Sequence, residues 1–491
     1  MKTTTTAEQK SQGRGLRTLA AMGMAALLAS CGGGGGSAGV CFGSYAVCNP
    51  SPTADYSGVL SANIPSENVA GFCDANGQRQ FTRSYFNEAY LWSDEVPEVN
   101  SSAYTPEQYF YQLRVTTPDI LGLPKDRFSY VVPNTTADTI STGVGASYGV
   151  YWVKDASGVT RVAQIVPSSP ASAAGMARGG ILVSVISSSN TSWYPDNPGE
   201  VVSFSYKANA AATATTLTLT STKVAEDPVP NQKVITTDKG RRVGYVLFNA
   251  FTRGAQDKLI TTMTSMAAAG IQDLVLDLRY NGGGFLYVAH ALGSMVTGPA
   301  NDGKVFERLQ YNKSRTADSE GSTYNISGTT LVGETTFGKD AAMPRLNLPR
   351  VYILSSGRSC SASESVINGL RGVDVEVILV GDTTCGKPYG FTRQDNCGLS
   401  LFPIEFQGLN HKGFGDFMAG FTATCPAPDD FDRALGDATE GLLSRALSHA
   451  DTGVCTPAVA LSLDTRKAQS AAPATGLQLD LAPQRPGKIV N

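Results

Sequence analysis

The stretch V-Y-I-L-S-S-G-R-S-C-S-A-S-E-S, residues 351–365, decides the fold because its pattern changes from strand to helix across one turn. V-Y-I-L predicts a buried strand, and S-E-S-V-I-N-G-L, which begins at Ser363, predicts a helix. Six of the eleven residues from 355 to 365 are serine. A serine at such a turn projects its hydroxyl at the sheet edge, where free N–H groups of the helix start can stabilise an oxyanion. The stretch therefore predicts an α/β sheet that carries a nucleophilic serine.

Strand and helix patterns alternate on both sides of this turn. V-G-Y-V-L-F at 243–248 and D-L-V-L-D-L-R-Y at 273–280 predict buried strands before it, and V-E-V-I-L-V-G at 375–381 predicts one after it. A helix pattern near 254–269 separates the first two strands. This order predicts an α/β domain over residues 223–450, with its sites at the carboxyl ends of the strands.

A serine hydroxyl is a weak nucleophile until a base removes its proton. The three histidines lie in no recognisable triad pattern and are expected to be structural or exposed; they are His290, His411 and His449. The stronger candidate is Lys387, which follows the strand V-I-L-V-G. Parallel strands bring their carboxyl ends together, so this lysine is expected near the serine turn, where burial would lower its pKa from about 10.4. A solvated loop lysine is the alternative interpretation.

The length and composition are those of a globular protein with several domains. At roughly 100–200 residues per domain, 491 residues exceed one compact core. A hydrophobic fraction of 42% and a charged fraction of 16% are ordinary for a globular chain. The net charge is −3 and no basic run occurs, so nucleic acid is not an expected partner.

Two smaller domains are expected before the α/β domain. Residues 71–139 show helix patterns, with an aromatic stripe in T-R-S-Y-F-N-E-A-Y-L-W and a capping box in T-P-E-Q. Residues 140–222 change to strand patterns, with Y-G-V-Y-W-V-K and V-T-R-V-A-Q-I-V joined by a D-A-S-G turn, and T-L-T-L-T at the end. Within this segment a short helix ends at Gly175, and a turn at Gly179 and Gly180 leads into a buried strand.

The first thirty residues have the pattern of an export signal. Basic residues precede a short apolar core that cannot span a bilayer as a mature helix. L-A-S-C resembles the bacterial lipoprotein signal, which implies that Cys31 is lipidated and becomes the N-terminus; a plain secretory signal in residues 1–30 is the alternative. Gly32 after the cysteine implies the outer membrane. Residues 31–70 are expected to be a flexible tether, and residues 451–491 a disordered tail.

The cysteines favour disulfides. Nine are present, and the eight besides Cys31 are an even number, which in an oxidising compartment favours pairing over metal sites. Cys41–Cys48 and Cys385–Cys397 are plausible local pairs, and the other connectivity stays open. Disulfides at Cys360 and Cys385 could stiffen the turns that carry the candidate serine and lysine. Cysteine catalysis is the weaker alternative, because no histidine partner is placed.

Several motifs occur in the order found in C-terminal-processing (tail-specific) serine peptidases. S-A-S-E at 361–364, then the strand V-I-L-V-G and then G-K, resemble that family, and D-L-R-Y-N-G-G-G at 277–284 resembles its second landmark. The similarity extends over roughly residues 80–450. It implies a multidomain α/β protein: a small helical N-terminal domain, a β-rich PDZ-like module, and a crotonase-like or ClpP-like α/β serine peptidase domain.

The resemblance implies roles for individual residues. It assigns Ser361 as nucleophile, Lys387 as base, the backbone N–H groups of Ala362 and Gly283 as oxyanion hole, and Glu364 as a carboxylate that orients the lysine in some members. The family often has glutamine four residues after the lysine, but this chain has Phe391, so the third catalytic member is unassigned. Asp277 is interpreted as a structural cap at the end of its strand.

The PDZ-like module is implied to bind a substrate C-terminus. Such modules add the peptide as a strand and hold its carboxylate with backbone N–H groups. The corresponding loop here is Tyr148, Gly149 and Val150. Gly180 departs from the aspartate that is usual at its position, and a β-rich spacer that binds nothing is the alternative.

Together these features predict a serine endopeptidase on the periplasmic face of the cell envelope, lipid-anchored in the outer membrane of a Gram-negative bacterium. Its partners would be protein substrates, recognised through their C-termini, and the membrane. No metal or organic cofactor is implied. The alternative function is a catalytically inactive, envelope-anchored PDZ-type peptide-binding protein. Acyl transfer of the penicillin-binding type is disfavoured, because the S-x-x-K spacing is absent around Ser361.

Overall fold

The computed structural model describes residues 40–42, 47–49, 58–190, 192–455 and 488–490. The chain divides into two compact units, residues 1–54 and 55–491. In the first unit the described residues form two antiparallel strands, β1 (Val40–Phe42) and β2 (Val47–Asn49). The predicted tether therefore contains a strand pair. Its last residues contradict the prediction, because they belong to the second unit, where Ser66–Asn68 form a 3-10 turn and Leu60 and Val69 are buried. The backbone of Cys41 lies opposite that of Cys48, and a disulfide between them stays a prediction. The predicted signal peptide and Cys31 lie outside the described residues.

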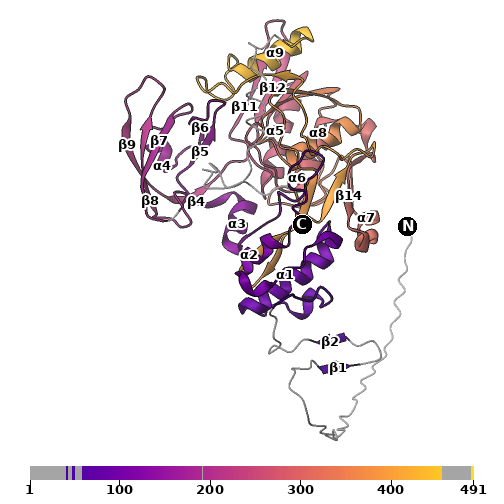
Figure 1. The fold of residues 1–491 in the computed structure, drawn as a ribbon. Coiled ribbons are helices and arrows are strands. Elements are labelled where there is room, and N and C mark those ends of the chain that lie inside the picture. The colour runs from indigo at the N-terminus through magenta and orange to yellow at the C-terminus, as the bar shows by residue number, and fades with distance from the viewer. Residues whose placement is uncertain (1–39, 43–46, 50–57, 191, 456–487, 491) are drawn as a thin grey trace, which may run out of the picture. The chain divides into compact units, whose positions relative to one another are not determined.

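The second unit begins with the predicted helical region (Figure 1). Its helices are α1 (Ala75–Ala89), α2 (Pro106–Gln112) and α3 (Asn134–Thr142), with short 3-10 turns at Ser66–Asn68, Ser93–Glu95 and Ser101–Ala103. The capping box is confirmed: Thr105 and Gln108 exchange side chain-to-backbone hydrogen bonds of 3.2 and 3.1 Å at the start of α2. The aromatic stripe forms core, since Phe86 meets Phe110 edge to face with ring centroids 5.1 Å apart. Trp92 lies beyond the end of α1.

A separate antiparallel sheet follows. Its five strands have the order β5-β6-β7-β8-β9, and β4 pairs with β10 beside it. The elements are β4 (Val144–Ser147), β5 (Val150–Lys154), β6 (Thr160–Ile165), α4 (Pro170–Ala173), β7 (Ile181–Ser188), β8 (Val201–Lys207), β9 (Thr215–Thr220) and β10 (Thr222–Ala225). Buried Trp152 packs edge to face against Phe204, 5.7 Å between ring centroids. The sequence pattern identified the other strands of this sheet but missed β8. Its prediction that the strand after Gly180 is buried was wrong, because β7 leaves Val183, Val185 and Ile186 exposed.

The main sheet has six strands in the order β11-β12-β13-β16-β17-β22, all parallel except the edge strand β11. Its elements are β11 (Asn231–Thr236), β12 (Arg242–Leu247), α5 (Ala255–Ala268), β13 (Asp273–Asp277), α6 (Leu286–Val296), β16 (Arg350–Ser355), α8 (Ala362–Gly372), β17 (Glu376–Gly381), β22 (Cys425–Pro426) and α9 (Gly441–Thr452). Each strand and helix predicted around the serine turn is present. The serine turn joins β16 to α8 and lies at the carboxyl end of the sheet.

Both faces of this sheet are buried, which explains its nearly continuous apolar strands. On one face, Leu442 and Leu443 of α9 pack in one cluster with Tyr245, Tyr352 and Val380. On the other face, Gly244 leaves space for Met266 of α5, whose sulfur would lie 2.9 Å from a Cβ at that position.

A second sheet lies beside the main one and includes the end of the chain. Its order is β15-β14-β21-β18-β23, and a three-stranded sheet β19-β20-β3 connects to the helical region. The elements are β3 (Tyr130–Pro133), β14 (Val305–Tyr311), α7 (Thr316–Gly321), β15 (Thr323–Asn325), β18 (Tyr389–Thr392), β19 (Gln394–Asn396), β20 (Leu399–Phe402), β21 (Phe406–Leu409) and β23 (Lys488–Val490), with 3-10 turns at Pro299–Asn301 and Lys313–Arg315.

The predicted disordered tail is therefore wrong at both of its ends. Helix α9 continues to Thr452, because its apolar side chains cover the main sheet. The last described residues pair with β18 as strand β23. Residues 456–487 lie outside the described residues.

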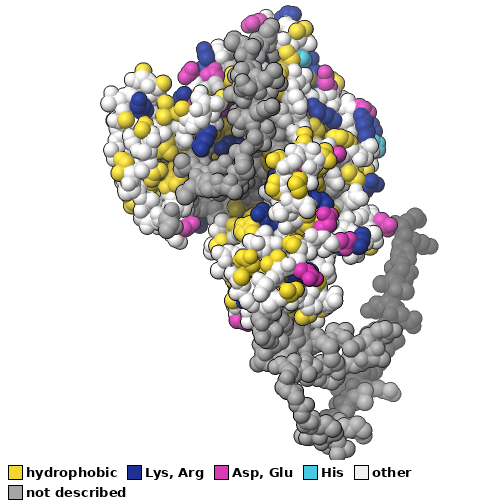
Figure 2. Space-filling view, viewed as in Figure 1, with side chains coloured by type: hydrophobic (Ala, Val, Ile, Leu, Met, Phe, Trp, Pro, Cys, Tyr) yellow, Lys and Arg dark blue, Asp and Glu magenta, His cyan; other side chains and the backbone are white. Residues whose placement is uncertain are grey.

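The apolar character of the helices and the distribution of surface charge bear on binding to membranes and nucleic acids. Among the described residues, none of the helices has the length and apolar character needed to cross a membrane. On the face shown in Figure 2, basic and acidic side chains are interspersed over the described residues, in keeping with a net charge of −3.

Gly180 is required by its neighbour Tyr206. A Cβ at position 180 would lie 2.5 Å from Cε2 and 2.6 Å from Cζ of the buried Tyr206 ring. We predict that Gly180→Asp lowers the free energy of unfolding by about 1–3 kcal/mol, because a rigid ring cannot give way. In a double-mutant cycle, Tyr206→Ala should absorb most of this loss. Urea unfolding followed by tryptophan fluorescence measures both changes; strictly additive losses would contradict the steric explanation.

Candidate active site

Ser361 occupies the turn between β16 and α8 in a strained conformation. Its φ is 57° and its ψ is −108°, and its side chain is fully buried. A non-glycine residue in this region costs about 1–3 kcal/mol and is typical of a nucleophile elbow. Ala362 is the first residue of α8. The first four backbone N–H groups of an α-helix have no partner within the helix, and the Ala362 N–H is one of them.

The other serines of this stretch have structural roles. Each donates its hydroxyl to a backbone carbonyl: Ser355 to Asp382, Ser356 to Arg279, Ser359 to Leu278, Ser363 to Asn281 and Ser365 to Ser361. Three of the acceptors belong to the segment after β13, so these hydroxyls fasten the serine turn to the neighbouring strand end. Ser359 and Ser363, which sequence alone could confuse with the nucleophile, are thus accounted for.

The glycine turn lies directly against Ser361. Gly283 has a φ of +105°, and a Cβ there would lie 2.9 Å from the Cys360 carbonyl oxygen and 3.1 Å from both the Ala362 nitrogen and Ser361 Cβ. Only glycine fits this approach. The predicted pair of oxyanion donors is therefore brought together. In this structure the Gly283 N–H donates to Asn281 Oδ1 at 2.9 Å, so an oxyanion would have to replace that side-chain oxygen.

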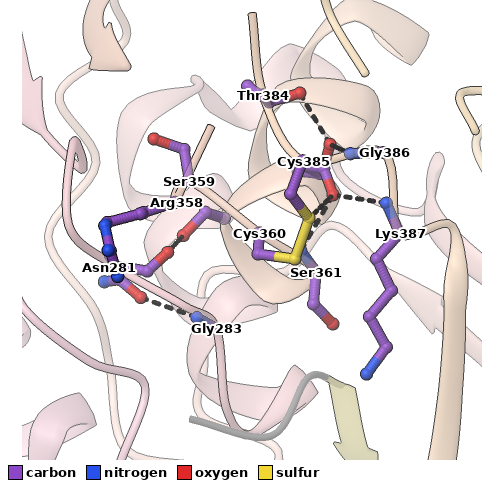
Figure 3. Close-up of a disulfide and its surroundings, with 12 residues drawn as sticks. Asn281, Gly283, Arg358, Ser359, Cys360, Ser361, Thr384, Cys385, Gly386 and Lys387 are labelled. Atoms are coloured by element: carbon purple, nitrogen blue, oxygen red, sulfur yellow. Dashed lines mark hydrogen bonds between the residues drawn. A yellow bond between two sulfur atoms is a disulfide. The ribbon is translucent and has the colours of Figure 1, made fainter. Parts of the chain in front are cut away.

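Lys387 is buried beside the serine turn, with 3% of its surface exposed. Figure 3 shows the side chains of Ser361 and Lys387 extending in the same direction from neighbouring turns. The lysine Nζ lies 4.2 Å from the ring centroid of Phe391 and 5.3 Å from that of Phe128. Phe391, which replaces the family's glutamine, is thus a wall of the lysine pocket. Phe128 comes from the helical region, and no local sequence signal indicated it.

Glu364 holds both turns through their backbones. Its Oε2 accepts from the N–H of Ser361 at 2.9 Å and from the N–H of Lys387 at 2.8 Å. Its Oε1 accepts from Thr384 Oγ1 at 2.6 Å and from the Gly386 N–H at 2.8 Å. Burial raises the pKa of the Glu364 carboxyl, and these four donors oppose the rise. The carboxylate therefore positions the lysine through its main chain.

A disulfide joins the same two turns. Cys360 bonds to Cys385, with Cα atoms 5.2 Å apart (Figure 3). This corrects the expected local pair Cys385–Cys397, because Cys397 bonds to Cys73 of the helical region instead. The chain path brings the serine turn beside the lysine loop, a proximity that sequence separation does not reveal. A third disulfide joins Cys425 to Cys455.

No histidine is placed as a base. His290 contacts the Asn325 carbonyl, His411 accepts from the Val305 N–H, and His449 contacts the Tyr352 hydroxyl. Burial lowers the pKa of His290 to about 4. Two clusters of potential metal ligands occur among the described residues, but both depend on cysteines that are joined in disulfides.

Asp277 was predicted to cap local backbone groups, but its shorter hydrogen bonds are to buried side chains, and the Arg279 N–H lies 3.4 Å from its Oδ1. It accepts from the Tyr245 hydroxyl at 2.8 Å and from the Arg279 guanidinium at 2.9 Å. Arg279 is fully buried and also pairs with Glu440 at 2.7 Å and Asp429 at 2.8 Å. Burial alone would raise the pKa of Asp429, but the guanidiniums of Arg279 and Arg178 hold it below its usual value.

Arg178 connects the five-stranded sheet to this charged cluster. It lies in the loop after α4 and donates to Asp429 Oδ1 at 2.7 Å and to the Tyr280 hydroxyl at 2.8 Å. Tyr280 in turn donates to Asp429 and precedes Asn281 in the glycine turn. Nothing in the local sequence pattern marks this arginine as part of a site.

The loop proposed to bind a carboxylate has a defined geometry. Tyr148 is buried, Gly149 has a φ of +75°, and the Gly149 N–H donates to Ser147 Oγ at 2.9 Å. Val150 begins β5, which is an edge strand of its sheet. Within the described sheet, β5 therefore has a ladder partner, β6, on one side only.

Comparisons with known proteins agree with this architecture. Residues 242–395, which include Ser361 and Lys387, match the model of peptidase family S41, and residues 77–130 match the model of the S41 N-terminal domain. No curated protein matches the chain. A candidate S41 protease from Bacteroides fragilis has a similar solved structure, with 21% identity and a TM-score of 0.58 over 76% of this chain and 97% of its own. The photosystem II D1 C-terminal processing protease covers 71% of this chain and 92% of its own at 17% identity and a TM-score of 0.44.

The fold and the two family matches define the class of protein as a peptidase. Residues 242–395 belong to peptidase family S41, and residues 77–130 belong to the S41 N-terminal domain family. The protein is a serine peptidase, and its substrates are proteins.

The Glu364 carboxylate can be tested by a nearly isosteric change. Glu364→Gln replaces one of the two carboxylate oxygens with an NH₂ group, which donates hydrogen bonds and does not accept them. The two groups that donate to that oxygen would then lose their acceptor. We predict a loss of unfolding free energy of about 2–6 kcal/mol, at about 1–3 kcal/mol for each unsatisfied group. Denaturant unfolding without reductant measures it.

Glu107→Gln in the exposed first turn of α2 is the matched control, with a predicted change of no more than about 0.5 kcal/mol. Equal stability of the two variants would show that the carboxylate does not hold the turns together.

Proposed function

We propose that this peptidase cleaves peptide bonds with Ser361 as nucleophile and Lys387 as base. One observation carries the proposal: a single carboxylate oxygen, Glu364 Oε2, accepts from the backbone N–H groups of both residues. The strained elbow at Ser361 and the burial of Lys387 among aromatic rings support the same assignment. Exclusion of water from an amine favours its uncharged form, which is the form that can accept a proton.

The proposed reaction has two stages. Lys387 Nζ takes the proton of Ser361 Oγ as that oxygen attacks the substrate carbonyl, and the negative charge moves to the carbonyl oxygen. The N–H groups of Ala362 and Gly283 stabilise this oxyanion once Asn281 Oδ1 has yielded its place. Lys387 then protonates the leaving amine as the C–N bond breaks. A water molecule hydrolyses the acyl-enzyme, with the same lysine accepting its proton.

We further propose that substrates are presented by their C-termini to the PDZ-like module, through Tyr148, Gly149 and Val150. The position of β5 at the edge of its sheet supports addition of a peptide strand. The contacts of Arg178 with Asp429 and Tyr280 support coupling, because Tyr280 lies in the chain immediately before the glycine turn. The similar photosystem II enzyme is a C-terminal processing protease by name.

The proposed location is the periplasmic face of a bacterial cell envelope, with the chain anchored by a lipid on Cys31. The export-signal pattern motivates this proposal, and the three disulfides among the described residues suit an oxidising compartment. Metabolic labelling with a radioactive fatty acid should mark the parent protein and not Cys31→Ser. Labelling of both proteins would place the lipid on another residue, and labelling of neither would exclude a lipid anchor.

The catalytic pair is tested by variants of its two members and a neighbour. We predict that Ser361→Ala and Lys387→Ala each lower kcat/KM on labelled casein by at least about 1,000-fold. Lys387→Arg should be as inactive, because a guanidinium keeps its proton and cannot act as a base. Ser359→Ala, which removes only a structural hydroxyl, should retain activity within about tenfold.

Circular dichroism of each variant controls for folding. Activity of Lys387→Arg near that of the parent would exclude the lysine as base, and activity of Ser361→Ala would exclude the serine as nucleophile.

A further inference from the structure

Strand β18, which follows Lys387, has residues 488–490 on its outer edge. Strand β18 pairs antiparallel with β21 on one side and parallel with β23 on the other. The facing pairs are Gly390 with Lys488, Phe391 with Ile489 and Thr392 with Val490. Because β18 lies next to last in its sheet, removal of β23 would leave β18 as an open edge beside the active site.

We propose that this edge of β18 is a binding site for an extended peptide main chain, and that residues 488–490 of the same chain are its resident occupant. This segment would then compete with substrate for the active site. The competition rests on the proposed function, whereas the binding of the segment does not. An open strand edge binds an extended peptide through main-chain hydrogen bonds with little demand on its sequence.

The direction of β23 indicates which part of a substrate would lie here. Lys387 precedes β18, and the pairing is parallel, so the N-terminal end of β23 is the end nearer to the lysine. In Figure 3 the yellow strand passes below the ends of the Ser361 and Lys387 side chains. The site would therefore hold the residues that follow the cleaved bond, toward the substrate's C-terminus.

The pairing also reaches the lysine pocket. Phe391, whose ring centroid lies 4.2 Å from Lys387 Nζ, faces the middle residue of β23 across the ladder. Ser361 has no exposed surface and Lys387 has 3%. A protein substrate therefore reaches Ser361 and Lys387 only after a segment that covers them has moved. Displacement of β23 would free the edge of β18 to which a substrate strand could bind.

A strand of three residues can compete because it is tethered. A few ladder hydrogen bonds, worth about 0.5–1.5 kcal/mol each, bind weakly in solution. The tether, however, starts at Cys455, which a disulfide fixes to Cys425 of the main sheet. A segment that belongs to the same chain as its binding site has an effective concentration on the order of 1 mM. With a dissociation constant between about 0.1 and 1 mM, the apparent KM would rise about two- to elevenfold.

The first test is kinetic. A chain ending at residue 487 should show a KM for labelled casein that is lower by about two- to elevenfold, with unchanged kcat. Lys488→Pro/Ile489→Pro should act in the same way, because successive residues of a strand turn their N–H groups to opposite sides and one of the two lost donors must face β18. Gln478→Pro/Leu479→Pro, ten positions upstream, is the matched control and should behave like the parent. An unchanged KM in both altered chains would overturn competition.

The second test needs no catalysis, so it separates failure of this proposal from failure of the proposed function. The probe is a fluorescent peptide with the sequence of residues 484–491, and the protein is Ser361→Ala, with or without residues 488–491. The shortened protein should bind the peptide at least about twofold more tightly than the full-length one, because its edge is vacant. A peptide with proline at the positions of Lys488 and Ile489 should bind neither. Equal binding by both proteins, or none by either, would overturn the proposal whatever the peptidase activity.

Discussion

One buried carboxylate holds the candidate site together. Glu364 lies in the first turn of α8, and four donors from the serine turn and the lysine loop converge on its two oxygens. A carboxylate removed from water is strongly destabilising unless such donors compensate for it. Because the donors come from two separate loops, α8 can bury Glu364 only when both loops are in place. The relative position of Ser361 and Lys387 is therefore linked to the formation of the helix.

The strain at Ser361 is sustained by the same surroundings. A residue with a φ of 57° and a ψ of −108° persists only where its neighbours over-determine its conformation. Here the neighbours are the serine hydroxyls that bond to the segment after β13, the disulfide from Cys360, and Gly283 in close contact. The richness in serine thus has a physical reason: small hydroxyl side chains satisfy buried carbonyls of a turn that has no regular ladder.

The strands of the main sheet, and the edge at which the candidate residues meet, could be predicted from the sequence. Strands β12, β13, β16 and β17 and their helices were visible as patterns, and the carboxyl ends of parallel strands necessarily share one edge. That rule suffices to bring Ser361, Lys387 and Gly283 together. It could not give the partner of Cys385, the presence of Phe128 beside the lysine, or the backbone role of Glu364, because these follow from the packing of loops and domains far apart in sequence. The pairing of residues 488–490 with β18 was hidden for the same reason, since three residues carry no pattern of their own.

Phe391 stands where the family often has glutamine, and the backbone contacts of Glu364 bear on this difference. A polar third residue is needed where a lysine must be oriented by its side chain, but here the main chain of Lys387 is fixed by Glu364 and followed at once by Pro388. What the amine then needs is an environment suited to both of its forms. Two aromatic rings lie beside the amine, and their faces attract the ammonium that forms on proton transfer. On the proposed mechanism, Glu364 positions the backbones of the serine and the lysine, and Phe391 contributes an aromatic wall at the position of the family's glutamine.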